Sequence, residues 1–435
     1  EPFFEPLRKA VDNLKIRLSY GSLGNQQIGY YDFIQTITTK GSMSDYSFDG
    51  TVLGQHATVS DPVSGDQTWE KVVSKNLGLD LNMFNNRLSL TTDFYIRDTK
   101  GILGKGKSLP SIYGASEPQM NANNLRTKGY ELVLGWRDSF KLAGSTFSYG
   151  ITGTFSDYTA EYTKCDNPTG LIGDPYVGKK YGEIWGYKVD GLFRNDKEAA
   201  EYASRIDLST VASGYYTATG AYGKGVRGGD IKYLDLNGDN IVNGGKGTLD
   251  DPGDRRVIGN SSPRYQYGAS LNFSWYGFDV SVFMQGIGRL DWYPGADNLR
   301  FWGPYCRPYA TFVPKNFMSQ VWSEENPDAY FPRARAYTSL NSNSGTAYYT
   351  NDRYLQNLAY CRLKNLTIGY TIPRRLTSKV GIKECRIYFS GENLATWSAL
   401  KSDFLDPEQA AADSDKKANV YPWCKTYSIG LNLTF

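Results

Sequence analysis

The residues best arranged for metal chemistry lie in one short loop segment, 235–241. Oxygen donors recur there at alternate positions, from the side chains of Asp235, Asn237 and Asp239 and from the backbone carbonyl of Ile241. This spacing is the first half of a calcium-binding loop. Asn240 occupies the sixth position, where it can adopt the left-handed backbone that usually requires glycine. The twelfth position is Lys246 and not an acid, so a metal-free loop of Asx turns is the alternative.

A second candidate site is the aromatic segment 288–353. Three residues near proline or glycine are candidates for contact with a ligand or a protein lid: Trp292, Trp302 and Tyr305. Rigid aromatic side chains bind at low entropic cost and stack well on sugar rings. The alternative is that so long a segment needs a hydrophobic core of its own. We favour that interpretation for Phe317 and Trp322.

Residue counts exclude most other chemistry. His56 is the single histidine, and the five cysteines are scattered without metal-ligand spacing, which leaves almost no room for histidine-based catalytic or zinc sites. We therefore predict no enzyme. We interpret the cysteines as mostly structural, and their spacing leaves open whether any two form a disulfide. The 48 basic and 45 acidic residues nearly cancel, so nothing in the overall charge indicates a nucleic-acid partner.

The elements that position these segments are strands with period-two alternation. In 265–275 and 427–435, large apolar or aromatic residues alternate strictly with small polar ones. The full set comprises 14–20, 77–83, 88–96, 130–136, 147–155, 265–275, 278–284, 366–372, 387–389 and 427–435. A strand between lipid and a wet interior requires this pattern. No run of 18 apolar residues exists, which excludes spanning helices. We predict an all-β chain that forms a transmembrane antiparallel β-barrel, with about ten or more strands.

The connections alternate in length. Those after the second, fourth, sixth and eighth strands are short, whereas the others are long: 21–67, 99–126, 157–263, 288–353 and 392–425. Short turns on one side and long loops on the other are typical of outer-membrane barrels. Segments 30–38 and 46–59 could add one more hairpin. Charged residues on the wet face, such as Arg17, Asp93, Arg97, Glu131 and Arg137, could line a solute path, but we favour ion pairs within the wall.

Several ordered stretches resemble a known family. They include Tyr181-Gly-Glu-Ile-Trp-Gly-Tyr-Lys-Val-Asp-Gly-Leu-Phe193 and Gly391-Glu-Asn-Leu394, and the others are 14–25, 68–70, 85–90, 127–132, 229–239, 362–370 and 426–435. Together they resemble the C-terminal part of SusC/RagA-type TonB-dependent transporters from the outer membrane of Bacteroidetes. The resemblance extends over essentially all of 1–435. It implies a barrel of about 22 strands whose plug domain and N-terminal strands lie outside this chain.

The resemblance also implies a function and a further ligand. Such transporters import large nutrients, oligosaccharides or peptides, with a SusD-like lipoprotein lid and with TonB. The calcium-like loop in the family runs into an Asp followed by Arg. The match here is Asp254 before Arg255, so Asp254 would be the fifth calcium ligand.

Two alternatives of other classes remain open. One is a secreted or surface β-protein that binds or cleaves carbohydrate, and the other is a self-contained small porin of ten strands. No carboxylate pair stands out for glycosidase chemistry. The alternation of loop lengths also has no explanation in a soluble sandwich. We therefore favour the importer.

Overall fold

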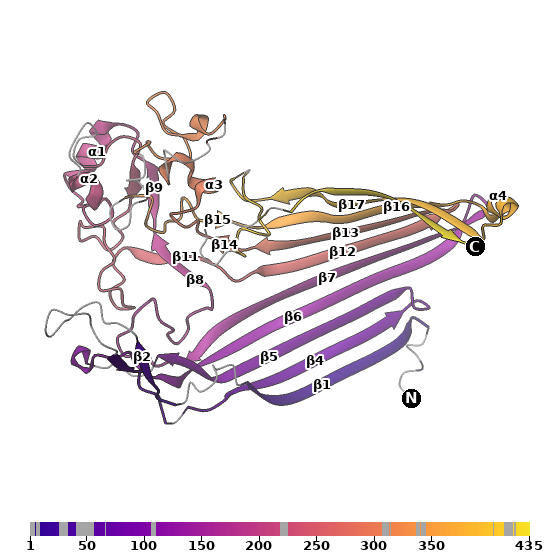
Figure 1. Cartoon of the computed structure of the whole chain (residues 1–435), viewed down its shortest axis with the longest axis horizontal. Coiled ribbons are helices and arrows are strands. Elements are labelled where there is room, and N and C mark those ends of the chain that lie inside the picture. Colours follow the sequence, from indigo (N-terminus) through magenta and orange to yellow (C-terminus); the bar gives the residue numbers. More distant parts are fainter. Residues whose placement is uncertain are drawn as a thin grey trace.

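Ten strands form one antiparallel sheet in chain order. The computed structural model describes residues 5, 9–25, 34–40, 56–65, 67–105, 110–217, 225–306, 313, 315–335, 340, 345–402, 404–412, 421 and 423–435. The sheet runs through β1 (Val11–Asn25), β4 (Glu70–Met83), β5 (Leu88–Lys105), β6 (Gln119–Leu142), β7 (Ser145–Lys164), β12 (Arg264–Trp275), β13 (Phe278–Arg289), β16 (Tyr360–Thr371), β17 (Glu384–Ser398) and β18 (Thr426–Thr434). Every predicted strand is confirmed. In Figure 1 these strands lie side by side as one long, curved wall.

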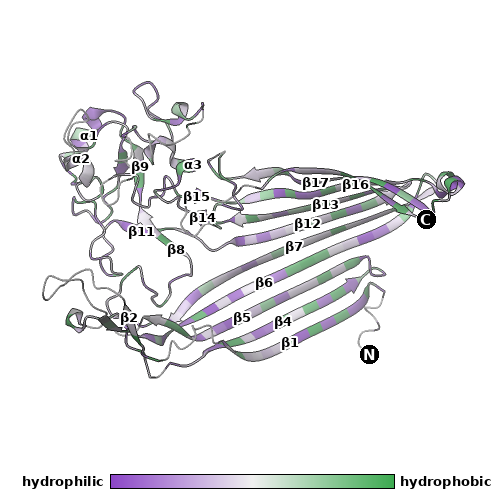
Figure 2. Ribbon diagram, viewed as in Figure 1, coloured by the Kyte–Doolittle hydropathy of each residue, from purple (hydrophilic) through white to green (hydrophobic). Residues whose placement is uncertain are grey.

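The register keeps one face apolar and the other polar. Leu271 of β12 pairs with Ile151 of β7 and with Val282 of β13. The next residue, Asn272, pairs with Gly150 and Ser281 and faces the opposite side. Residues paired across antiparallel strands share a face, so the alternation in each strand adds up to two continuous surfaces. Figure 2 shows the resulting hydrophobic and hydrophilic bands along the strands.

The apolar face carries an aromatic cluster near the short turns. The rings of Phe140 and Phe147 lie 5.3 Å apart, and those of Phe278 and Tyr370 lie 4.6 Å apart. Trp136 donates a hydrogen bond from Nε1 to the hydroxyl of Tyr149 over 3.1 Å. Amphipathic aromatic residues in such a row mark the edge of the hydrocarbon region in outer-membrane barrels.

The short turns have the backbone that tight hairpins require. β6 and β7 are joined by Ala143 and Gly144, and β12 and β13 by Tyr276 and Gly277, all four with positive φ. Two-residue turns of this kind match the twist of the strands they join. The last short connection, 372–383, is longer and contains α4 (Arg374–Thr377) and the 3₁₀ turn η6 (Ser378–Val380). All four short connections lie at the end of the wall opposite the long ones (Figure 1).

At the other end the strands continue further than the alternation predicts. β5 and β6 stay paired as far as Lys105 and Gln119, so most of the expected connection 99–126 is strand. Asn121 and Asn124 in this extension bond to backbone groups of Thr68 and Gly101. Strand outside the hydrocarbon need not alternate apolar with polar residues, so the sequence pattern fades before the strand ends. β2 (Ile37–Lys40) pairs with β3 (His56–Val59), which overlaps the ends of the expected hairpin of 30–38 and 46–59. Residues 30–33 and 46–55 of that prediction lie outside the described residues.

The two longest connections fold together into a cap. The first contains β8 (Glu183–Tyr187), β9 (Val189–Leu192), α1 (Asp196–Ala203), α2 (Ser213–Thr217), β10 (Ile231–Tyr233) and β11 (Arg255–Asn260). The second contains β14 (Asp291–Trp292), α3 (Leu299–Trp302), the 3₁₀ turns η3 (Gly303–Tyr305) and η4 (Met318–Gln320), and β15 (Gln356–Asn357). Buried side chains from both connections make one hydrophobic core. In the described ranges, none of the helices has both the length and the apolar character to cross a bilayer.

Candidate functional site

The candidate functional site consists of the polar face of the wall and the cap above it. On that face Arg17 bridges two strands, with Nη2 2.7 Å from Asp93 Oδ2 and Nε 2.9 Å from Asp80 Oδ2. Arg386 makes a similar pair with Asp279, over 2.9 Å. The favoured prediction, ion pairs within the wall, is confirmed for Arg17 and Asp93.

The other charged residues predicted on this face have weaker contacts. Arg137 donates from Nε to the carbonyl oxygen of Asn86 over 3.0 Å, and the Arg97 guanidinium lies 5.8 Å from the ring of Tyr95. Within the described part of the chain, Glu131 forms no ion pair. Unlike Arg17, these groups are not locked to a partner charge.

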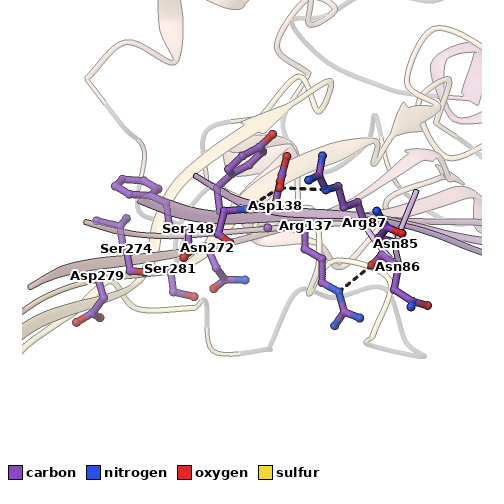
Figure 3. Close-up of a pocket in the computed structure, with 15 residues that line it drawn as sticks. Asn85, Asn86, Arg87, Arg137, Asp138, Ser148, Asn272, Ser274, Asp279 and Ser281 are labelled. Carbon is purple, nitrogen blue, oxygen red and sulfur yellow. Dashed lines mark hydrogen bonds and ion pairs between the residues drawn. The ribbon is translucent and has the colours of Figure 1, made fainter. Parts of the chain in front are cut away.

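A cavity of about 750 Å³ lies against the wall near the short turns. Figure 3 shows Arg137, Asn272 and Ser281 projecting from one side of the sheet, whereas the ion pair of Arg87 and Asp138 lies on the other. On the polar face, the lining of this cavity offers the guanidinium of Arg137, the amide of Asn272 and the hydroxyl of Ser281.

A short segment, 404–412, is tied to the polar face close to the cap. Arg362 of β16 is almost fully buried and contacts two acids of the segment, Asp406 over 2.7 Å and Glu408 over 2.8 Å. Lys364 lies 2.8 Å from Glu408 as well. On its other side the segment contributes Leu405 to the core of the cap. The segment therefore connects the wall with the cap.

The predicted contact residues Trp292, Trp302 and Tyr305 lie inside the cap, which corrects that prediction. Trp302 has no exposed surface, and Tyr305 and Trp292 are 1% and 4% exposed. The Trp302 ring lies 4.8 Å from that of Phe301 and 5.1 Å from that of Tyr354. The physical reason is the alternative given above, because a segment of this length must bury apolar surface of its own. Phe317 and Trp322 are buried as expected.

The calcium-like loop is held by hydrogen bonds from its own backbone. Asp235 accepts from the N–H groups of Gly238 and Asn240 over 2.7 and 2.9 Å. Asp239 Oδ1 accepts from the N–H of Ile241 over 2.8 Å, and Asn237 Oδ1 accepts from the N–H of Asp239 over 3.1 Å. Asn240 adopts the expected left-handed conformation, with φ of 67°.

Asp254 holds the same loop from the protein interior. Its carboxylate is fully buried and accepts from the N–H groups of Leu236 and Asn243 over 2.7 and 2.9 Å. Its oxygens are thus engaged by the backbone. Among the described residues, no cluster of three or more His, Cys, Asp or Glu side chains is arranged to hold a metal. The donor types suit calcium, and the calcium set Asp235, Asn237, Asp239, Ile241 and Asp254 stays a prediction.

A buried ion pair joins the two halves of the cap. Arg335 Nη2 and Asp230 Oδ2 are 2.6 Å apart, and the Arg335 guanidinium also lies 4.2 Å from the Tyr215 ring. Burial raises the pKa of Asp230 to about 6, and the facing Arg335 opposes that rise. Sequence reasoning missed this pair, since the two residues follow no periodic pattern. It also missed Arg362, although a charged residue close to the apolar run of β16 was a possible signal.

Similarity to known proteins agrees with this architecture. No protein-family model matches the chain. The chain is 26% identical over 448 residues to TonB-dependent receptor P3 of Formosa agariphila, which covers 98% of this chain and 40% of that protein. It is 22% identical over 437 residues to TonB-dependent receptor SusC of Bacteroides thetaiotaomicron, which covers 98% of this chain and 38% of that protein. The chain thus spans about two fifths of the length of these curated relatives.

A solved structure has the same fold. The structure of the RagAB peptide transporter superposes with a TM-score of 0.68 at 22% identity, over 98% of this chain and 41% of that one. The chain is similar to SusC/RagA-type TonB-dependent receptors over nearly its whole length. These similarities indicate a location in the outer membrane, and the apolar face of the wall suits contact with lipid.

Proposed function

We propose that this chain forms part of the wall and the extracellular cap of an active importer of large nutrients, either oligosaccharides or peptides. The observation that carries the proposal is the register of the wall. The pairing scheme aligns Leu271, Val282 and Leu366 on one apolar face and Asn272 and Ser281 on the opposite, polar face. Such a two-faced sheet separates hydrocarbon from a water-filled path.

The edges of the sheet support the idea that other strands complete the barrel. In the described structure, β1 and β18 each pair on one side only. An unpaired strand edge inside hydrocarbon leaves backbone groups without partners, which costs several kcal/mol for each group. We propose that further strands, a plug domain and a segment that engages TonB complete the barrel, because the chain spans only about two fifths of the length of its curated relatives.

The cap is the proposed contact surface for a SusD-like lipoprotein lid. Its core fixes the shape of the outer surface, because Trp302, Tyr305 and Trp292 bind the two connections together and do not reach solvent. A lid needs a rigid rim against which to close. Residues that contact the lid or a nutrient must then come from the exposed surface of the cap and not from its aromatic core.

The test uses the full-length parent protein expressed in a bacterial outer membrane. We expect it to require detergent for extraction and to change gel mobility on heating, as closed barrels do. We also expect a surface lipoprotein to co-purify with it, and uptake of an oligosaccharide or peptide to stop when TonB is deleted. A soluble protein that needs no detergent would contradict the proposal and favour the secreted carbohydrate-binding alternative.

A further inference from the structure

The connection between β16 and β17 carries an unusual concentration of positive charge. Residues 373–383 contain four basic side chains and no acid: Arg374, Arg375, Lys379 and Lys383. All four are exposed, and among the described residues none of them forms an ion pair. The three other short connections differ. Arg87 is their one basic residue, and it is paired with Asp138 over 3.2 Å.

Two large apolar side chains are exposed among these charges. Leu376 is 54% exposed and Val380 is 72% exposed. They lie four residues apart along the helical stretch of α4 and η6, as do Arg375 and Lys379. The stretch therefore exposes two apolar side chains next to two basic ones. A segment with this composition fits the boundary between lipid headgroups and acyl chains.

The segment is an ordered part of the wall. Ile372 donates its N–H to the carbonyl of Cys385 over 2.9 Å, and Lys383 donates to the carbonyl of Thr434 over 2.8 Å. Inside the turn, Ile382 donates to the carbonyl of Thr377, whose side chain is buried. Gly381 ends the helical stretch with φ of 78°, a left-handed conformation that glycine adopts without strain. The exposed side chains of Leu376 and Val380 are therefore carried by an ordered, hydrogen-bonded turn.

Its position matches the edge of the membrane. The N–H of Thr371, at the end of β16, donates to Gly277 in the neighbouring two-residue turn over 2.8 Å. That turn carries Tyr276, and the adjacent rings of Phe278 and Tyr370 belong to the aromatic cluster of the apolar face. Figure 1 places α4 at the ends of the strands, far from the cap.

We infer that the 372–383 connection is a binding surface for anionic phospholipid headgroups at the short-turn face of the membrane. The inference rests on the proposed function, which places this end of the wall on the periplasmic side. Basic residues near a membrane surface attract anionic lipid, and the two apolar side chains add a contact with acyl chains. Phosphate groups suit arginine and lysine donors, and among the described residues none of the four cations has an ion-pair partner that would compete with a lipid phosphate.

In the experiment, the purified full-length protein in detergent is titrated with phosphatidylglycerol and, separately, with phosphatidylcholine. Native mass spectrometry counts the bound lipids. A fourfold variant removes the charges: Arg374→Gln, Arg375→Gln, Lys379→Gln and Lys383→Gln. A matched control removes four exposed charges from the cap: Arg194→Gln, Arg205→Gln, Lys246→Gln and Lys315→Gln. We expect the first variant to bind phosphatidylglycerol at least about tenfold more weakly and the control to bind like the wild type.

A third variant separates lipid from soluble phosphate. Leu376→Ser with Val380→Ser keeps all four charges, and we expect it to lose part of the phosphatidylglycerol binding. Soluble glycerol 3-phosphate should fail to compete with the lipid. Competition by glycerol 3-phosphate, or equal phosphatidylglycerol binding by wild type and fourfold variant, would overturn the inference. If the fourfold variant still changes gel mobility on heating, it still folds as a barrel, and any loss of lipid binding is due to the removed charges. A wild-type protein without that shift would contradict the proposed function itself.

Discussion

Arg335 and Asp230 contact each other over 2.6 Å in the interior of the cap, and they come from the two longest connections of the chain. Both side chains are almost fully buried. The contact therefore ties together two segments that are more than a hundred residues apart in sequence. It also places a complete charge pair where water cannot screen it.

Removing one partner of this pair should destabilise the cap strongly. Asp230→Ala leaves the Arg335 charge buried opposite an apolar side chain, and we expect the free energy of unfolding to fall by about 3–5 kcal/mol. The double variant Asp230→Ala with Arg335→Met should recover much of that loss. Thermal unfolding of the full-length protein, followed by tryptophan fluorescence, measures both. If the single and double variants have the same midpoint, the pair does not contribute as described.

The start of α1 should give the cap a dependence on acidic pH. Burial alone would raise the pKa of Glu198, but hydrogen bonds from the Arg194 N–H and Lys232, over 2.7 and 3.0 Å, lower it below its ordinary value. A lowered pKa in the folded state contributes stability above the unfolded pKa of about 4.3, and this contribution is lost as the pH falls through the folded value.

The variant Glu198→Gln should remove this contribution. We expect the cap of the variant to be less stable than that of the wild type at pH 7, and the two proteins to converge towards pH 3. Unfolding in urea at a series of pH values makes the comparison. A constant difference between the two proteins across that range would exclude the carboxylate of Glu198 as its source.

Asp254 should matter for the loop 235–243 whether or not a metal binds there. Asp254→Ala leaves the N–H groups of Leu236 and Asn243 without their buried acceptor, which costs about 1–3 kcal/mol for each group that water cannot reach. We expect faster hydrogen exchange across the loop in this variant. Asp250→Ala is a suitable control, because Asp250 is exposed.

The calcium prediction has its own test. If the loop binds calcium, adding the ion should slow hydrogen exchange in 235–243 of the wild type, and Asp239→Asn should weaken the effect. Asp239 is exposed and lies within the loop, so its substitution spares the buried Asp254 contacts. Identical hydrogen exchange in calcium and in chelator would contradict the calcium prediction and favour a metal-free loop held by its own hydrogen bonds.

The two faces of the wall should respond differently to the same new charge. Leu271→Arg places a charge on the lipid face and should cost about 2–4 kcal/mol if the residue lies near the middle of the bilayer. Asn272→Arg puts the same side chain on the inner face, where water is available, and should be tolerated. The yield of heat-shifted barrel in the outer membrane reports the difference. An equal loss of yield in both variants would mean that the two faces do not contact lipid and water respectively.

The strands of the wall were predictable because each side chain faces one of the two sides of the sheet, and only apolar side chains are compatible with the side that contacts lipid. Leu271 and Asn272 alternate, and a shift of one residue would reverse every pair along the strand. The turn at Ala143 and Gly144 is equally local. The extension of β5 to Lys105 was not predictable, because beyond the hydrocarbon polar and apolar residues are equally acceptable on both faces.

The cap could not be derived in the same way. Trp302 is suited both to a hydrophobic core and to an exposed binding surface, and irregular backbone gives no period from which to choose. Arg335 and Asp230 carry no sequence signal that joins them, since long-range contacts between loops depend on the complete fold. Asp254 was found through resemblance to a family, and its position next to the loop became clear only from its hydrogen bonds.

Each of the two long insertions leaves and re-enters the wall at strands that are direct neighbours. Ser156 pairs with Gln266 on either side of the first insertion, and Ile287 pairs with Tyr360 on either side of the second. The wall therefore does not need either of them to close its hydrogen bonds. An exchange of the cap at these four positions would need both insertions together, because each contributes apolar side chains to the one shared core.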